Sequence, residues 1–336
     1  MGDRVAVVGA GGWGTALSVL LKDKGHDVFL WARDPEYAEL MSRKRENERY
    51  LPGVRIPEEV KVTSDLSVIG DCSAVVLAVP SHGMREICGK MVPYLRRDHL
   101  LLSGAKGIEL GSLKRMSEVI WEVVGDVVDK PPAAISGPTH AEEVGRRMAS
   151  AAVVACSDID VARRFQEMLM GPYFRVYTSR DIVGVELGGS LKNVVAIAVG
   201  IGDGLSFGDN ARGALITRGL AEIARLGIAM GANPLTFAGL SGMGDLVTTC
   251  ISKYSRNRWV GEQIGKGRKL EDVLSEMVMV AEGVKTTIAA MELSKKMGIE
   301  MPITSQVYEV LFQGKDPMKA VSELMLRMPK EEMIGL

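Results

Sequence analysis

The chain has 336 residues, of which 46% are hydrophobic and 25% charged, a composition typical of a globular protein long enough for two domains. A formal net charge of -1 and an aromatic content of 5% argue against a basic surface or a stacking platform for nucleic acid or an anionic membrane. An anionic partner would therefore be small and held by a few placed cations.

The first half of the chain alternates short apolar runs with helical patterns. Strands are expected at Val5–Val8, Asp27–Trp31, Val60–Thr63, Ala74–Val79, Leu100–Ser103, Ala133–Ser136, Ala151–Ala155 and Phe174–Tyr177. Several of these runs are continuously apolar, which is typical of strands that are covered on both faces. The alternation predicts an α/β domain with a mostly parallel, doubly wound sheet.

Strand signals almost disappear after Asp181. Helices are expected at Ile182–Gly200, Arg212–Gly231, Arg256–Gly265, Gly283–Lys296 and Ile303–Gln313, with glycine and proline between them. We therefore place a domain boundary near residue 181, with a doubly wound domain over 1–181 and an all-helical C-terminal domain over 182–336.

Cysteine spacing and the chain start indicate the compartment. The four cysteines show neither C-x-x-C spacing nor histidines at ligand spacing, so we expect reduced thiols and no metal site. The chain enters an apolar run almost at once, and its longest apolar stretch, Val194–Ile201, is short for a membrane span. These features predict a cytoplasmic protein without stable membrane insertion.

A glycine-rich motif, Gly9-Ala10-Gly11-Gly12-Trp13-Gly14, joins the first strand to a helical pattern over Thr15–Lys24. In a G-x-G-x-x-G turn, Gly9 permits the tight turn, Gly11 admits a pyrophosphate to the backbone, and Gly14 allows close packing of helix on strand. The helix N-terminus attracts the phosphate charge. The motif therefore predicts a Rossmann-type dinucleotide site.

The end of the second strand bears on the choice of cofactor. A site for NAD usually has an acidic residue there, whereas this strand ends at Trp31 and continues to Arg33 and Asp34. An arginine can pair with the 2′-phosphate of NADP. Arg33 thus favours NADP, while Asp34 keeps NAD open.

Lys192 is the strongest candidate for acid–base chemistry. Ketone reduction by hydride needs a group that gives the oxygen a proton. Lys192 lies in an apolar helical pattern, where desolvation would lower its pKa toward the working pH; the alternative is a lysine that reaches the surface. Gly188 and Gly189, one turn earlier, indicate close approach of another group to the helix backbone.

Two polar residues could complete that site. Asn193 follows Lys192 and could bind substrate, or be an ordinary polar helix residue. Asp245, in a glycine-rich turn, could hold the lysine ammonium and a substrate hydroxyl, or cap the helix that begins there. Thr249 lies one turn downstream and is a weaker candidate.

Two further segments suit an anionic substrate. Lys106 follows the strand Leu100–Ser103, at the strand end where α/β sheets bind ligands. Ser255-Arg256-Asn257 begins a helical pattern, and a helix N-terminus with an arginine suits a phosphate, although a capped surface helix is the alternative.

Several blocks of the sequence resemble the bacterial NAD(P)-dependent glycerol-3-phosphate dehydrogenases. In chain order they are Gly9–Leu17, Tyr50–Val54, Ala105–Gly107, Ser136–Ala141, Glu186–Asn193, Gly242–Leu246, Ser255–Asn257 and Ala281–Gly283. They span nearly the whole chain. One departure is Gly12, where the family more often has serine.

The resemblance implies a role for each of these positions. Lys192 would be the catalytic proton donor and acceptor. Substrate contacts would be Lys106, Gly137, Thr139, Lys192, Asn193, Asp245, Ser255, Arg256 and Asn257. Cofactor contacts would be Gly9, Gly11, Gly12, Trp13, Gly14, Arg33, Lys106, Ala141, Arg256, Val280 and Glu282. The resemblance further implies a homodimer, no metal, and NADP or NAD as cofactor, with NADPH favoured for reduction of dihydroxyacetone phosphate to sn-glycerol 3-phosphate for phospholipid synthesis.

Two other functions stay open at this point. Another dehydrogenase of the same architecture, acting on a different 2-keto or hydroxy acid, would share the glycine motif and a helical Lys–Asn pair; the Ser255–Asn257 segment argues for a phosphate instead. A non-catalytic nucleotide sensor would share the fold, but it would not need a buried Lys192.

Overall fold

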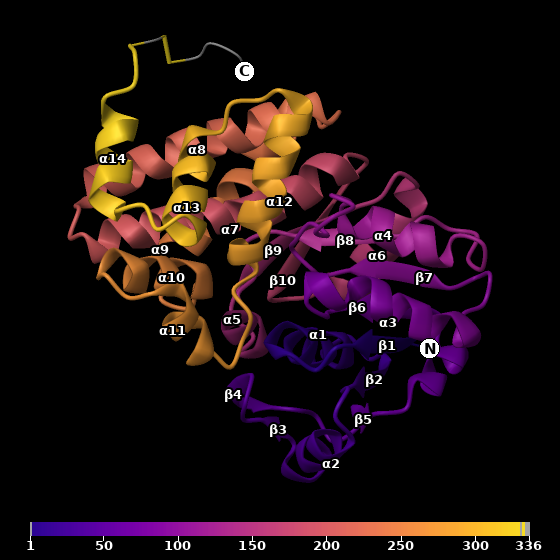
Figure 1. Cartoon of the computed structure of the whole chain (residues 1–336). Helices are drawn as coiled ribbons and strands as arrows, with labels where there is room; N and C mark the ends of the chain where they lie inside the picture. Colours follow the sequence, from indigo (N-terminus) through magenta and orange to yellow (C-terminus); the bar gives the residue numbers. More distant parts are fainter. Residues whose placement is uncertain (1, 330, 333–336) are drawn as a thin grey trace. The chain divides into compact units, whose positions relative to one another are not determined.

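The computed structural model describes residues 2–329, 331 and 332. The chain divides into two compact units, one made of Met1–Lys106 with Arg115–Ile182 and the other of Gly107–Lys114 with Val183–Leu336 (Figure 1). Residues 107–114 join the second unit, which the sequence pattern did not predict. They do so because Ile108 is buried with the apolar residues of the helical unit and the Gly107 carbonyl accepts from the Ser190 hydroxyl at 3.3 Å.

The first unit is built on an eight-stranded sheet in the order β10-β9-β8-β7-β6-β1-β2-β5. Its strands are β1 (Arg4–Val8), β2 (Asp27–Trp31), β5 (Lys61–Thr63), β6 (Ala74–Leu77), β7 (Leu100–Ser103), β8 (Ala133–Ser136), β9 (Ser150–Ala155) and β10 (Phe174–Ser179). Neighbours pair in parallel, except that β8 and β9 pair antiparallel. The expected doubly wound, mostly parallel sheet is therefore confirmed.

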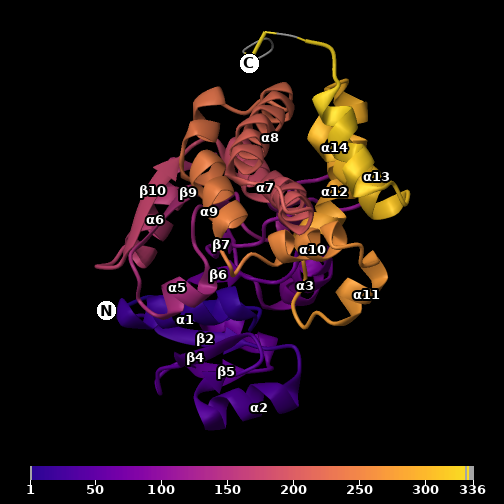
Figure 2. The ribbon, with the colours of Figure 1, turned by 90° about the vertical axis from the view of Figure 1, so that its left-hand side faces the viewer.

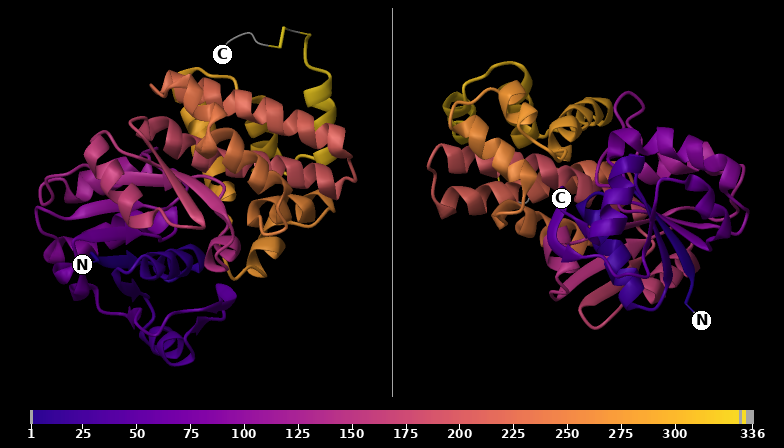
Figure 3. Two further views of the ribbon diagram at one scale, coloured as in Figure 1. Left: turned by 180° about the vertical axis from the view of Figure 1, so that it is seen from behind. Right: turned by 90° about the horizontal axis from the view of Figure 1, so that it is seen from below.

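Helices cover both faces of this sheet (Figure 3). They are α1 (Gly12–Asp23), α2 (Pro35–Lys44), α3 (Met84–Met91), α4 (Met116–Val124), α5 (Ala141–Gly145) and α6 (Ile159–Leu169). In β1, Val5 and Val7 join one core with α1 and α6, whereas Ala6 and Val8 join the other with α3 and α4. This alternation explains the continuous apolar runs, since both faces of the strand are buried.

The chain leaves β1 toward β2 on one side of the sheet and later returns to β6 on the other side of β1. A reversal of strand order of this kind creates a crevice at the carboxyl ends of the strands. The glycine motif follows β1 directly and therefore lies at this switch point.

A small antiparallel pair, β3 (Glu46–Asn47) and β4 (Leu51–Arg55), stands apart from the main sheet. It was not expected, because Pro52 and Gly53 are unusual inside a strand. Gly53 has a φ of 77°, and a two-stranded edge tolerates the proline.

The second unit is helical over the residues that the structure describes. Its helices are α7 (Ile182–Gly204), α8 (Asp209–Ala229), α9 (Asp245–Ile251), α10 (Arg256–Gly265), α11 (Leu270–Ser275), α12 (Glu282–Met297), α13 (Pro302–Phe312) and α14 (Pro317–Met325). A 3-10 turn (η4, Pro234–Ala238) and a π turn (η5, Leu240–Gly244) precede α9. The expected all-helical C-terminal domain is confirmed.

Helix α7 lies at the centre of this unit, alongside α8 (Figure 2). Its 23 residues are long and apolar enough to cross a membrane by length and composition, although the run Val194–Ile201 alone was too short to predict a membrane span. The most apolar stretch is 83% buried inside the protein, as in the core helix of a globular unit. The glycines along α7 are the reason neighbouring helices can bury it so closely.

Candidate active site

The glycine motif forms a tight turn into α1. Gly9 has a φ of 115°, and a Cβ on Gly14 would lie 1.8 Å from the Gly9 carbonyl oxygen, so neither position tolerates a side chain. A Cβ on Gly11 would meet open space, which leaves the backbone approachable. Gly11 caps α1 without a side chain, so the first N–H groups of the helix are not satisfied by a capping side chain.

Asn47 holds this turn in place, a role that sequence reasoning missed. Its Nδ2 donates to the Ala10 carbonyl at 2.9 Å and to Thr15 Oγ1 at 2.7 Å. Its Oδ1 accepts from the Tyr37 hydroxyl at 2.8 Å and from the Tyr50 N–H at 3.2 Å. Asn47 is fully buried, so these bonds tie the glycine turn to α2 and to the β3–β4 pair.

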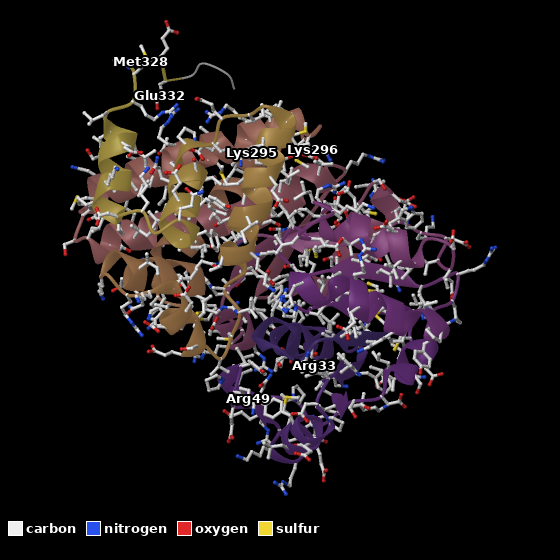
Figure 4. All side chains as sticks on the ribbon, in the orientation of Figure 1. Arg33, Arg49, Lys295, Lys296, Met328 and Glu332 are labelled. Carbon is white, nitrogen blue, oxygen red and sulfur yellow. The ribbon has the colours of Figure 1, made fainter. Side chains whose placement is uncertain are left out.

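The two residues at the end of β2 that could select the cofactor, Arg33 and Asp34, have different surroundings. Asp34 Oδ1 accepts from the N–H groups of Glu36 and Tyr37 at 3.1 and 3.3 Å, which makes Asp34 the N-cap of α2. Arg33 is exposed at the carboxyl end of β2 (Figure 4). The carboxylate is committed to the backbone, whereas the guanidinium faces solvent.

Lys106, Gly137 and Thr139 meet at the ends of β7 and β8. Lys106 Nζ donates to the Gly137 carbonyl at 3.0 Å, and the Thr139 hydroxyl donates to the same oxygen at 3.1 Å. Gly137 has a φ of 138°, and a Cβ there would crowd the Ala151 carbonyl at 2.9 Å. The three predicted positions are therefore neighbours within the first unit.

Ala141, for which the sequence offered no physical argument, begins α5. Its Cβ would lie 3.5 Å from a Cβ placed on Gly12, and the indole of Trp13 lies 2.8 Å from a Cβ placed on Gly104. Ala141 thus packs against the glycine turn, where a larger side chain would narrow the approach to α1.

Lys192 lies in a buried polar cluster of the helical unit. Its Nζ is 2.7 Å from Asp245 Oδ1 and also donates to the hydroxyl of Thr249, which is itself 3.4 Å from Asp245 Oδ1. The lysine and aspartate side chains are 6% and 3% exposed. Burial disfavours the charged ammonium, and the neighbouring carboxylate favours it. The structure thus shows the pairing that the sequence suggested, and it places Thr249 in direct contact.

The close approach predicted at Gly188 is made by protein backbone. A Cβ on Gly188 would lie 2.7 Å from the Ser241 carbonyl oxygen in the π turn η5. This contact brings the turn that leads into α9 onto α7. Asp245 is the first residue of α9 rather than its N-cap, which is Gly244. Gly188 therefore serves to bring Asp245 to Lys192.

Asn193 and Asn257 are bonded to each other. Asn257 Nδ2 donates to Asn193 Oδ1 at 2.9 Å, and Asn257 Oδ1 accepts from the Gly283 N–H at 2.9 Å. A Cβ on Gly283 would lie 2.7 Å from the Asn193 carbonyl. These bonds fix the start of α10 and the start of α12 against the helix that carries Lys192.

The N-terminus of α10 has the features of an anion site. Ser255 caps it, with its hydroxyl accepting from the Arg258 N–H at 3.2 Å. Arg256 is exposed, and its Nη1 donates to the Val280 carbonyl at 2.9 Å. Glu282 is the first residue of α12, two positions later. The predicted positions Ser255, Arg256, Val280 and Glu282 therefore share one region of the helical unit.

Helices α7 and α10 pack backbone to backbone through glycines. A Cβ on Gly200 would lie 2.0 Å from the Arg258 carbonyl, and one on Gly261 would lie 2.1 Å from the Ile197 carbonyl. Gly204 and Gly265, each four residues further on, make matching contacts. Such small-residue spacing lets two helices touch, so the distance between the Lys192 cluster and the start of α10 is set by backbone.

Comparison with known proteins decides the family. The N-terminal domain of the NAD-dependent glycerol-3-phosphate dehydrogenases matches residues 4–162, and the C-terminal domain of the same family matches residues 181–322. The chain belongs to this family. It is thus an NAD(P)-dependent oxidoreductase.

Individual relatives agree. A glycerol-3-phosphate dehydrogenase [NAD(P)+] of Prosthecochloris aestuarii is 52% identical over 98% of this chain and 99% of its own length. A crystal structure of glycerol-3-phosphate dehydrogenase from Coxiella burnetii is 39% identical, with a TM-score of 0.92 over 97% of this chain and 99% of that one. A ketopantoate reductase from Ralstonia eutropha, 16% identical, covers 95% of this chain and 99% of its own with a TM-score of 0.61 and shares the fold alone.

The first unit fits a nicotinamide dinucleotide. The open space at Gly11 and the uncapped start of α1 suit a pyrophosphate, and Arg33 suits a 2′-phosphate. The individual contacts of cofactor and substrate stay predictions.

Proposed function

We propose that the chain interconverts dihydroxyacetone phosphate and sn-glycerol 3-phosphate with NAD(P)(H). The observation that carries the proposal is the buried pair of Lys192 and Asp245, closed by Thr249. A buried lysine held by a carboxylate is suited to proton transfer, because its position is fixed.

When bound, a reduced nicotinamide would supply the hydride for the carbonyl carbon of the substrate. Lys192 donates a proton from Nζ to the carbonyl oxygen, so that the ketone becomes a secondary alcohol. The neutral amine then regains a proton from water. Asp245 and Thr249 hold Nζ in one position throughout, and Asp245 stabilises the ammonium before transfer and after reprotonation. Oxidation runs through the same groups in reverse.

The phosphate would bind at the start of α10. Its N–H groups and the Arg256 guanidinium provide the donors, and the Asn193–Asn257 bond joins this helix start to the helix of Lys192. This arrangement favours a three-carbon phosphate over an unphosphorylated keto acid. Lys106, Gly137 and Thr139 stay predicted substrate contacts from the family resemblance.

Other properties belong to the same proposal. We infer a preference for NADPH in reduction from Arg33. Supply of glycerol 3-phosphate to phospholipid synthesis, a cytoplasmic location and a homodimer are expectations from the resemblance.

The test follows nicotinamide absorbance with purified protein, NADPH or NADH, and three ketones. Dihydroxyacetone phosphate should be reduced rapidly, unphosphorylated dihydroxyacetone poorly, and ketopantoate not at all. Lys192→Met should lower kcat by about a hundredfold or more, which is the usual contribution of a general acid. Binding of NADPH should persist.

Lys295→Met is the matched control, because Lys295 is exposed near the end of α12 (Figure 4). It should leave kcat unchanged. Near-normal turnover in Lys192→Met, or turnover of ketopantoate in preference to dihydroxyacetone phosphate, would remove the proposal.

A further inference from the structure

A half-open cavity of about 320 Å³ lies inside the helical unit, between α7, α8, α13 and α14. Its walls are mostly apolar. They include Ala198, Ile201, Phe207, Leu215, Val307 and Leu324. Among the residues that the structure describes, none of the Lys192 cluster and none of the α10 start lines it. Ligand sites commonly have this size and apolar character, with a few placed polar groups.

The charged groups of the lining are unequal in sign. They are three arginines, Arg218, Arg225 and Arg327, and one carboxyl, Glu222. Arg218, Glu222 and Arg225 follow one another at spacings of four and three residues along α8, so they share one face of the helix. The lining of the cavity therefore carries an excess of positive charge.

The single carboxyl of the lining is already engaged. Glu222 accepts from the N–H groups of Ile303 and Thr304 at 2.6 and 3.2 Å, at the start of α13. It therefore faces the helix N-terminus, and among the described residues neither Arg218 nor Arg225 has a side-chain ion pair.

Two guanidinium groups have only backbone partners within the described part of the chain. Arg218 donates to the Glu332 carbonyl at 3.2 Å, and Arg225 donates to the Glu300 carbonyl at 3.2 Å. Arg327 differs, because it pairs with the Glu300 carboxylate at 3.0 Å. Met328 and Glu332 lie beyond α14, near the end of the described chain (Figure 4). Arg218 and Arg225 retain further N–H donors for an anion.

Gln306 adds an unsatisfied acceptor to the same cavity. Its Nε2 donates to Glu323 at 3.2 Å, whereas its Oε1 is buried and has no hydrogen-bond partner among the described residues. A buried acceptor without a donor is costly, and an incoming hydroxyl or ordered water would satisfy it. Apolar walls, unpaired cations and an orphan acceptor together describe a site for an amphiphile.

We propose that this cavity binds a single-chain aliphatic carboxylate of about ten carbons, with the chain between α7 and α13 and the carboxylate on Arg218 and Arg225. The volume of about 320 Å³ has room for a chain of about ten carbons. The apolar walls select the chain, and the two arginines select the charge.

The test is isothermal titration calorimetry of the full-length protein with sodium decanoate, below its micelle concentration. One site per chain should saturate, and shortening the chain should weaken affinity about fourfold for each methylene removed. Decanol, which lacks the charge, should bind at least tenfold more weakly than decanoate.

Two variants locate the site. Ala214→Trp replaces a small exposed residue of the lining on α8 with one that fills the cavity, and it should abolish the heat of binding. Arg218→Gln should weaken decanoate about tenfold and leave decanol unchanged. Lys319→Gln is the matched control, because it removes an exposed cation of α14 outside the lining, and it should bind decanoate normally.

Three results would overturn the proposal. Binding that survives Ala214→Trp would place the ligand elsewhere, and equal binding of decanol and decanoate would remove the role of the arginines. Absence of decanoate binding would remove the ligand site. A change of sedimentation coefficient in Ala214→Trp would then indicate that the cavity is an interface between copies of this chain.

Discussion

Arg33 and Asp34 are adjacent in sequence but have different chemical tasks. Asp34 is held by two backbone N–H groups of α2, so its rotation toward a ribose would cost the helix its cap. Arg33 has no such duty to a helix. The sequence left the cofactor open because it could not show that the carboxylate was engaged.

Arg33→Gln should therefore lower kcat/KM for NADPH about tenfold or more, since one charge-assisted contact to the 2′-phosphate is lost. The value for NADH should stay within about twofold. Steady-state kinetics with each cofactor measures both.

Arg43→Gln is the matched control, because it removes an exposed cation of α2. It should change neither value. An equal loss with NADH and NADPH in Arg33→Gln would show that Arg33 does not read the 2′-phosphate.

The site residues found from sequence and those missed differ in the range of their contacts. Lys192 could be singled out because a lysine in an apolar helix is unusual locally. Asn47 could not, because all that distinguishes it is tertiary: a short link between α2 and β4 folds back onto the glycine turn. The same holds for the mutual bond of Asn193 and Asn257.

Among the elements, continuous apolar strands were predicted best. The strands Asp27–Trp31, Leu100–Ser103 and Ala133–Ser136 are observed with the expected bounds. The antiparallel pairing of β9 was missed, because strand direction depends on the connection and not on composition. Helix α7 runs on to Gly204, beyond the expected end at Gly200, because the glycines there pack against α10 instead of ending the helix.

The start of α10 is also held from its side by Asp203. This carboxylate, near the end of α7, binds Arg258 of α10 at 2.6 Å and Arg212 of α8 at 2.8 Å. Asp203 thus bridges α7, α8 and α10, and its partner Arg258 lies two residues after Arg256. We infer that Asp203 positions the first turn of α10 for the substrate phosphate.

Asp203→Asn should raise KM for dihydroxyacetone phosphate about tenfold with little change in kcat, because the phosphate donors lose their fixed position. Reduction of unphosphorylated dihydroxyacetone should be unaffected. Kinetics with both ketones separates this role from a general loss of structure, which would depress both.

Asp209→Asn serves as the matched control, since Asp209 also pairs with Arg212 but is 91% exposed. Arg256→Gln provides the reference for a direct phosphate contact. If Arg256→Gln impairs reduction of only the phosphorylated ketone, and Asp203→Asn impairs reduction of neither ketone, the positioning role is wrong while the phosphate site stands.

At the scale of the whole molecule, the boundaries of the two units depend on tertiary packing, which local sequence patterns do not show. Residues 107–114 lie between strands β7 and β8 in the sequence, yet Ile108 is buried, and Leu113 partly buried, among the apolar residues of the helical unit. Glu222 is a second case. A glutamate in a helical pattern is normally exposed, and only the arrival of the α13 N-terminus explains its burial.

Glu222 should make the stability of the chain depend on pH. Burial raises the pKa of its carboxyl to about 7. The hydrogen bonds from Ile303 and Thr304 and the charge of Arg225 lower this pKa, but burial has the larger effect. The folded chain therefore binds this proton more tightly than the unfolded chain, whose carboxyl has a pKa near 4.5. The contribution of Glu222 to the free energy of unfolding is thus highest below about pH 4.5, and it falls by roughly 3 kcal/mol as pH rises to about 7.

Glu222→Gln should remove this dependence, because the amide does not titrate and its oxygen can still accept from the start of α13. The informative quantity is the difference in thermal unfolding midpoint between variant and parent, followed from pH 5 to pH 8, in which other titrating groups cancel. It should shift in favour of the variant as pH rises. Glu292→Gln, at an exposed position of α12, should give a flat difference. A flat difference in Glu222→Gln as well would mean that the carboxyl titrates alike in the folded and unfolded chain, and that the α13 N-terminus fully compensates its burial.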